Sequence, residues 1–318
     1  GGYLISKKIE SNKISKNKIV SILNESGLKG KGGAGFPTGK KWEIVSRFEG
    51  KKYIAINGDE GEPGTFKDRY YLESDPHRFL EGLLIAANFI KAHEVYIYIR
   101  DEYPTVIEIL KKEISILEKE QIIPANYFIV RRGAGAYICG EESAMIESIE
   151  GKRGLPRHRP PYVAENGLFG KPTLTNNLET IYWIRDIIQR GPNWFSDQGI
   201  RGRKGFHSFS VSGRVKNPGV KVAPAGTTVQ ELIDNFCGGM IQGHKFKAYL
   251  PGGASGGILP SSLNNIPLDY GSKELDNEGC FLGSAAVVVL SDKDNMMDVG
   301  LNLLKFFEEE SCGQCTPC

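Results

Sequence analysis

Three cysteines near the end of the chain stand at intervals of three residues, in the stretch SCGQCTPC. Cys312, Cys315 and Cys318 have the spacing with which a tight loop brings thiolates to one iron–sulfur cluster. A cubane cluster needs four ligands, and the fourth is expected from a cysteine beyond residue 318, with Cys280 as the alternative. A disulfide or a zinc site is less favoured, because the chain has only six cysteines and zinc usually takes two separated CxxC pairs.

A glycine-rich stretch, KGKGGAGFPTGKKW at residues 29–42, has the composition of a nucleotide-binding loop. Its glycines let the backbone approach a ligand closely, Phe36 offers an aromatic face, and four lysines offer charge to a phosphate. The stretch contains G-x-G-x-x-G, but a predicted helix precedes it where the dinucleotide-binding fingerprint needs a strand. The alternative is a flexible surface turn.

An acidic loop, NGDEGEPGTFKDR at residues 57–69, directly follows a predicted strand. Its polar side chains Asn57, Asp59, Glu60 and Glu62 can accept hydrogen bonds from a flavin ring edge or from the ribose and amide of a nucleotide. Carboxylates do not suit phosphate, so we expect this loop to face the non-phosphate part of a ligand, where parallel sheets bind ligands. A solvated charged loop is the alternative.

A third segment, RRGAGAYICGEES at residues 131–143, joins a predicted strand to a helix that begins near Glu141. Backbone N–H groups at such a corner form an anion or ring-edge site, and Tyr137 can pack on a planar ligand. A tight corner without a ligand is the alternative. Asn176 and Asn177, at the start of a later helix, either cap that helix or complete a phosphate cradle.

The elements that must position these segments alternate in type. Residues 53–57, 94–100 and 127–132 have strand composition, and residues 77–90 and 104–120 have helical periodicity. This β-α-β-α-β order predicts a Rossmann-like α/β domain with a parallel sheet over residues 1–205.

After about residue 205 the pattern of predicted elements changes from alternating strands and helices to mostly strands. Residues 206–290 are predicted to form a small β-grasp domain, from two strands, a short helix with a capping box at Thr228 and Glu231, and further strands that include residues 280–290. Residues 291–318 are predicted to begin a helical [4Fe–4S] domain that is truncated.

Composition excludes several classes of protein. Hydrophobic residues make up 40% and charged residues 25% of the 318, which is ordinary for a globular chain of two or three domains. The formal net charge of +2 gives no sign of a nucleic-acid surface, and the longest apolar runs are too short to cross a bilayer. The few cysteines fit a reducing compartment, so a cytoplasmic location is expected.

Taken together, the four motifs resemble those of the NADH- and FMN-binding flavoprotein subunit of respiratory complex I. The same family includes subunits of soluble NAD-linked formate dehydrogenases and hydrogenases. Within it, the stretches FSVSGRVKNPGVKVAPAGTT, YLPGGASGGILP and GCFLGSAAVVVLSD look most like the β subunit of NAD-dependent formate dehydrogenase. Lys31 stands where the family usually has Arg, and Gly58 replaces Ala in the acidic motif.

The resemblance implies a set of cofactor-binding positions, carried over motif by motif. They are Gly30, Lys31, Gly32, Gly33, Ala34, Gly35, Phe36, Lys41, Asn57, Asp59, Glu60, Glu62, Tyr137, Gly140, Glu141, Glu142, Asn176 and Asn177.

The implied cofactors are FMN, NAD and a [4Fe–4S] cluster, and the implied reaction is hydride exchange between NAD(H) and FMN with single electrons passed to the cluster. The flavin carries this chemistry, so no general acid or base is assigned. The implied partners are a [2Fe–2S] thioredoxin-like subunit and an iron–sulfur catalytic subunit. A partner-docking scaffold with a structural metal site is the alternative from another class.

Overall fold

The computed structural model describes residues 2–11 and 13–316. Its first half is built on a parallel sheet of four strands: β1 (Tyr53–Gly58), β2 (Glu94–Ile99), β3 (Phe128–Arg132) and β4 (Thr173–Asn177). Two crossover helices, α5 (Pro76–Ile90) and α6 (Pro104–Lys119), join the first three strands in the predicted order. The predicted α/β fold with a parallel sheet is therefore confirmed.

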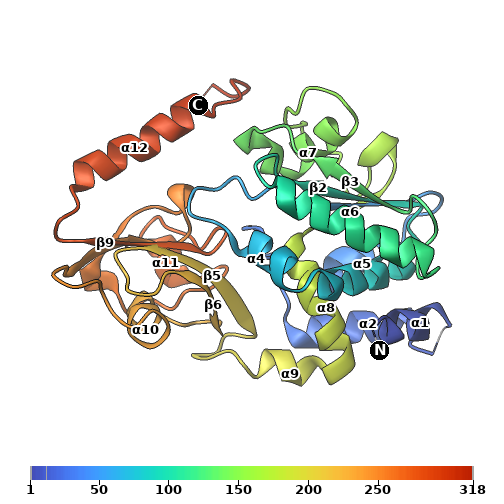
Figure 1. Ribbon diagram of the computed structural model, residues 1–318, viewed down its shortest axis with the longest axis horizontal. Helices are drawn as coiled ribbons and strands as arrows, with labels where there is room; N and C mark the ends of the chain where they lie inside the picture. Colours follow the sequence, from blue (N-terminus) through green and yellow to red (C-terminus); the bar gives the residue numbers. More distant parts are fainter. Residues whose placement is uncertain (1, 12, 317–318) are drawn as a thin grey trace.

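Both faces of this sheet are buried, as a parallel sheet requires. Along β1, Ile54 and Ile56 pack into the core formed with α5, α6 and α8 (Leu178–Arg190), whereas Tyr53 and Ala55 pack on the other face with α7 (Glu142–Ile149). The helices α1 (Leu4–Glu10), α2 (Lys16–Ser26), α3 (Thr38–Ser46), α4 (Lys67–Ser74) and α9 (Pro192–Ser196) complete this half (Figure 1).

The fourth strand was not predicted from the sequence, which placed only a helix start at residues 176 and 177. β4 pairs with β1 on the side opposite β2, so the sheet order is β3-β2-β1-β4. The order of the strands therefore reverses between β1 and β4. In open α/β sheets such a switch point leaves a crevice at the carboxyl ends of the two strands, where ligands bind.

A second, mixed sheet of five strands follows in the order β6-β5-β9-β7-β8. Its strands are β5 (Phe206–Gly213), β6 (Gly219–Pro224), β7 (Phe246–Leu250), β8 (Leu259–Pro260) and β9 (Ala286–Ser291). The short helices are α10 (Val229–Glu231), with the predicted capping box, and α11 (Lys273–Asn277). The strand predicted over residues 280–290 is wrong in its first half, because Cys280 lies in the buried loop before β9. We propose domain boundaries between residues 205 and 206 and between residues 290 and 291. The first of these boundaries separates the strands of the parallel sheet from those of the mixed sheet.

The last helix, α12 (Met296–Glu309), extends from the second sheet toward the elements around α7 (Figure 1). Its first turns pack on β7 and β9 through Met296, Val299 and Leu303. Its end reaches the short turn at Tyr137–Gly140, where the ring of Tyr137 lies 5.1 Å from that of Phe306. Among the residues that the structure describes, no helix is both long and apolar enough to cross a membrane.

Candidate functional site

Two adjoining cavities lie at the carboxyl ends of β1 and β4, with volumes of about 660 and 400 Å³. Asn57 at the end of β1 stands opposite Asn177 at the end of β4, because the two strands pair in parallel. Both cavities share a wall made of Gly32, Asn57, Gly140, Glu141 and Asn177. The structure thus brings all of the predicted loops to one place.

The larger cavity combines an apolar lining with one ion pair. Phe36, from the glycine-rich loop, and Tyr162 line it together with other apolar side chains. The Lys41 ammonium donates hydrogen bonds to Glu142 Oε2 at 3.2 Å and to Thr175 Oγ1 at 2.9 Å. Apolar walls with a few convergent polar groups are typical of sites for organic cofactors.

Lys31, predicted as a cofactor residue, lines the smaller cavity, but its ammonium is directed to the second sheet. Its buried ammonium donates to the Phe206 carbonyl at 2.5 Å and lies 3.0 Å from His207 Nδ1, and burial lowers its pKa to about 8. Its backbone N–H donates to Thr180 Oγ1 at 2.9 Å. Lys31 therefore ties the glycine-rich loop to the second sheet, and Lys41 is the lysine of this loop that lines the larger cavity.

The acidic loop lines the smaller cavity, but its carboxylates differ in their surroundings. Glu60 accepts hydrogen bonds from the backbone N–H groups of Asp68 and Arg69, and burial raises its pKa to about 8. Glu62 accepts from the Tyr137 hydroxyl at 2.5 Å and from the Ser255 N–H at 2.7 Å. Both residues thus hold neighbouring segments in place.

Asp59 is the exception in this loop. Its Oδ2 atom is buried and has no hydrogen-bond partner within the described chain, although the residue lines the smaller cavity. Burial raises the pKa of Asp59 to about 7, although the Arg100 guanidinium acts in the opposite direction. A buried carboxylate oxygen without a partner is costly, so this atom is an acceptor available to a donor on a bound ligand.

This environment predicts a pH-dependent effect of Asp59→Asn. Because the folded-state pKa lies above the ordinary value, ionisation of Asp59 costs the flavin-free protein stability as pH rises from about 4 to about 7. The gain in melting temperature from Asp59→Asn should therefore be larger near pH 8 than near pH 5. Thermal unfolding of both proteins at the two pH values measures it, and an equal change at both would contradict this account.

Residues at the start of α7 and the end of β4 form the rest of the shared wall. Glu141 caps α7 by accepting from the N–H groups of Ser143 and Ala144, both at 3.0 Å, and it also pairs with Arg159. Asn57 Nδ2 donates to the Gly140 carbonyl at 2.7 Å. A side chain on Gly32 would place its Cβ 3.1 Å from the Cβ of Asn177, so the loop packs closely on β4.

The two asparagines of β4 have internal partners. Asn176 Oδ1 accepts from the buried Trp42 Nε1 at 3.0 Å. Asn177 caps α8, which is one of the two roles considered for it from the sequence, by accepting from the Glu179 N–H at 3.0 Å.

Several lining residues were missed in the sequence. Ile44, Met145, Arg159, Tyr162 and Thr175 line the larger cavity. A usable signal was the basic run KRGLPRHR, which contains Arg159 and lies between α7 and β4. Thr175 gave no signal, because β4 itself was not predicted.

The cysteine segment follows α12. Cys312 is half-buried and Cys315 is exposed, whereas Cys318 lies outside the described residues. Within residues 2–11 and 13–316, no three Cys, His, Asp or Glu side chains are gathered closely enough to hold a metal ion as they stand. Cys280 is 4% exposed and belongs to the core of the second sheet.

A paired cavity at the switch point of a parallel sheet, with apolar walls and an unpartnered carboxylate oxygen, defines a nucleotide-cofactor-binding α/β protein. The aromatic side chains Phe36 and Tyr162 and the available acceptor on Asp59 fit a planar cofactor with polar edges, such as a flavin. Comparison with known protein families agrees. Residues 23–186 match the Nuo51 FMN-binding domain, residues 208–259 the SLBB domain, and residues 298–318 the NADH-ubiquinone oxidoreductase-F iron–sulfur binding region.

Individual relatives give the same result. The chain is 42% identical over 327 residues to an NADH-quinone oxidoreductase subunit of Rhizobium meliloti, covering 100% of this chain and 77% of the relative. It is 43% identical over 326 residues to an NADH-quinone oxidoreductase subunit of Aquifex aeolicus, covering 100% and 74%. An air-oxidised NAD⁺-reducing [NiFe]-hydrogenase structure matches with a TM-score of 0.85 and 33% identity, over 96% of this chain and 52% of the hydrogenase chain. The chain thus spans about half the length of that hydrogenase chain.

The chain belongs to the family of NADH-quinone oxidoreductase subunits that contain the Nuo51 FMN-binding domain. It is an NADH dehydrogenase-type oxidoreductase subunit, and its cofactors are FMN, NAD and a [4Fe–4S] cluster.

Proposed function

We propose that the two adjoining cavities hold FMN and the nicotinamide end of NAD(H) against each other, so that hydride passes between them. The observation that carries this proposal is the set of lining residues that the two cavities share at the ends of β1 and β4, which places ligands in the two cavities next to each other. When bound, FMN exchanges hydride with NAD(H) and exchanges single electrons with an iron–sulfur cluster.

The chain's own residues bind and orient the two ligands. Phe36 and Tyr162 supply apolar surface, Lys41 supplies positive charge in the larger cavity, and Asp59 supplies an acceptor in the smaller one. Preorganised groups of this kind contribute orientation and electrostatics, so no acid or base is needed on the protein.

The docking of α12 supports electron exchange with a cluster beside this site. Tyr137 lines the smaller cavity and contacts Phe306 and Phe307 of α12, while its backbone N–H donates to Glu310 Oε2 at 2.9 Å. The chain reaches Cys312 two residues later. The proposed cluster ligands therefore follow directly from a segment that contacts the cavity wall.

The expected result of a direct test is an FMN-containing protein that oxidises NADH with ferricyanide, an acceptor that takes electrons from flavin without a partner subunit. The visible spectrum, the flavin content after reconstitution and the ferricyanide rate measure it. A folded protein that binds no flavin after reconstitution would refute the proposed function and would favour the docking-scaffold alternative.

The narrower assignment is the β subunit of an NAD-dependent formate dehydrogenase, working with a [2Fe–2S] thioredoxin-like subunit and an iron–sulfur catalytic subunit in the cytoplasm. Its support is the set of sequence stretches in and around the second sheet, whereas the relatives named above belong to NADH-quinone oxidoreductases and a hydrogenase. Identification of the subunits that co-purify, with assays for formate-dependent NAD⁺ reduction, tests it. If hydrogenase or quinone-reductase subunits co-purify instead, the chain would be assigned to that complex and not to a formate dehydrogenase.

A further inference from the structure

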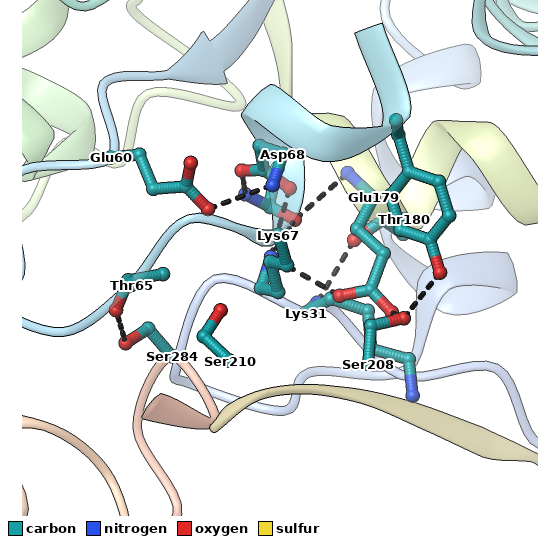
Figure 2. Close-up of polar contacts among 12 residues, drawn as sticks. Lys31, Glu60, Thr65, Lys67, Asp68, Glu179, Thr180, Ser208, Ser210 and Ser284 are labelled. Atoms are coloured by element: carbon teal, nitrogen blue, oxygen red, sulfur yellow. Dashed lines mark hydrogen bonds and ion pairs between the residues drawn. The ribbon is translucent and has the colours of Figure 1, made fainter. Parts of the chain in front are cut away.

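A buried polar network lies between the parallel sheet and the second sheet, around Lys67 at the start of α4 (Figure 2). The Lys67 side chain is 1% exposed. Its ammonium lies 2.9 Å from Asp68 Oδ1, 3.1 Å from Glu179 Oε2 and 3.3 Å from Asn177 Oδ1. The ammonium thus donates hydrogen bonds to Asp68 and Asn177 and forms a further ion pair with Glu179. Burial opposes the charge, but the two carboxylates hold the pKa of Lys67 well above its ordinary value.

The second sheet completes this network. Ser208 of β5 donates to Glu179 Oε1 at 2.6 Å, and Ser210 of the same strand accepts from the Phe66 N–H at 3.0 Å. The residues between and after them, Phe209 and Val211, point into the apolar core of the second sheet. Because alternate side chains of a strand point to opposite faces, β5 directs its hydroxyl groups to α4 and α8 and its apolar side chains to the core of the second sheet.

The network ends at the wall shared by the two cavities. Asn177 Nδ2 donates to Asp68 Oδ2 at 2.6 Å and lies 3.4 Å from the carbonyl oxygen of Asn57. Its Oδ1 accepts from Lys67 and from the Glu179 N–H. Both atoms of the Asn177 amide are thus held inside the protein, so Lys67 and Asp68 determine where this side chain and the end of β4 lie.

The smaller cavity needs a cation as well as a fixed wall. Five carboxylate residues of the described chain line it: Asp59, Glu60, Glu62, Asp68 and Glu141. Two described lysines line it too, but the Lys31 ammonium is directed to Phe206 and His207. Of these two, Lys67 is the lysine whose ammonium pairs with a carboxylate that lines the cavity, Asp68. An additional negative charge in such a cavity is disfavoured unless a nearby cation offsets it.

We propose that Lys67 is a positioning residue of the flavin site, which holds Asn177 at the shared wall and stabilises the reduced, more negative form of FMN relative to the oxidised form. This inference rests on the proposed function of the cavities. Lys67→Met, which removes the charge and keeps the length, should weaken binding of reduced FMN relative to oxidised FMN on the order of tenfold. That is the effect of one unit charge across roughly 10 Å at an effective dielectric constant of about 20. For a two-electron couple, tenfold corresponds to about 30 mV.

The experiment is a redox titration of bound FMN in the purified protein, followed by its absorbance, together with thermal unfolding. Lys67→Met should lower the flavin midpoint potential. Asp68→Asn removes a negative charge from the same cavity and should raise it. General loosening of the structure would not move the potential in opposite directions in the two variants.

Lys52→Met is the matched control for loss of a buried lysine. Lys52 is 8% exposed, and its ammonium donates to the Phe48 carbonyl at 2.8 Å, away from both cavities. This variant should lose stability without a change in potential. If Lys67→Met does not fold, the midpoint potential of Asp68→Asn alone tests the inference. An unchanged potential in Asp68→Asn, or shifts of the same sign in both cavity variants, would overturn the inference. Wild-type protein without bound flavin would instead refute the proposed function.

Discussion

Gly35→Ala is expected to destabilise the protein by about 2–4 kcal/mol and to abolish retention of FMN. Gly35 has a φ of +61°, and a Cβ at this position would lie 2.6 Å from the Cβ of Tyr270. Tyr270 cannot move away easily, because its ring is buried and its hydroxyl donates to the Lys31 carbonyl at 3.1 Å. The alanine must therefore displace the glycine-rich loop from the cavity wall.

Gly50→Ala separates the cost of the backbone conformation from the cost of the contact. Gly50 has a φ of +77°, but a Cβ there would meet no atom within 4 Å. It should cost only about 1 kcal/mol and leave the FMN content unchanged. Denaturant unfolding and the flavin-to-protein ratio of both purified variants measure the difference. Equal losses would show that Tyr270 does not hold the loop.

Cys315→Ser is expected to remove the iron–sulfur cluster and to leave FMN bound. The cysteine segment follows α12, whereas both cavities are built from the ends of β1 and β4 and from the loops around them. The serine hydroxyl is a poor substitute for a thiolate, so this variant loses one of the three cluster ligands at this spacing. Iron and acid-labile sulfide per FMN, with low-temperature EPR, measure the result.

Cys280→Ser is the control, and it should keep its iron. A Cβ at Gly257 would lie 2.5 Å from Cys280 Sγ, so this sulfur packs tightly against the backbone of the second sheet. Burial raises the pKa of the Cys280 thiol, which disfavours the thiolate that a cluster needs. Loss of iron in Cys280→Ser, with iron retained in Cys315→Ser, would make Cys280 a ligand and would refute the assignment to the terminal segment.

Local signals in the sequence were sufficient for much of this fold. Alternating strands and helices predicted the order β1, α5, β2, α6 and β3, because each element carries its own periodicity and its own caps. Asp75 caps α5 and Thr228 caps α10, as their residue types require. The same local order placed the acidic loop and the 131–143 segment at strand ends, where the cavities are found.

The pairing of β4 with β1 was decided by tertiary structure. Its sequence, TLTNN, is short and polar at its end, so it carries no strand signal strong enough to compete with the helix start at Asn177. Yet this pairing creates the switch point and places Asn177 opposite Asn57.

The sequence alone thus determined the class of site, through residue types and spacing that local chemistry can interpret. The tertiary structure decided where the charged side chains around the cavities are directed. Lys31 and Lys67 are both lysines beside glycine or acidic residues in the sequence, but one is directed to the carbonyl of Phe206 and the other to Asp68 and Glu179. The partners of Lys31, Phe206 and His207, lie 175 and 176 residues further along the chain and are brought to it by the packing of the second sheet on the first half, whereas Glu179 reaches Lys67 from α8 within the first half. Contacts of this range depend on the whole fold, and no local pattern records them.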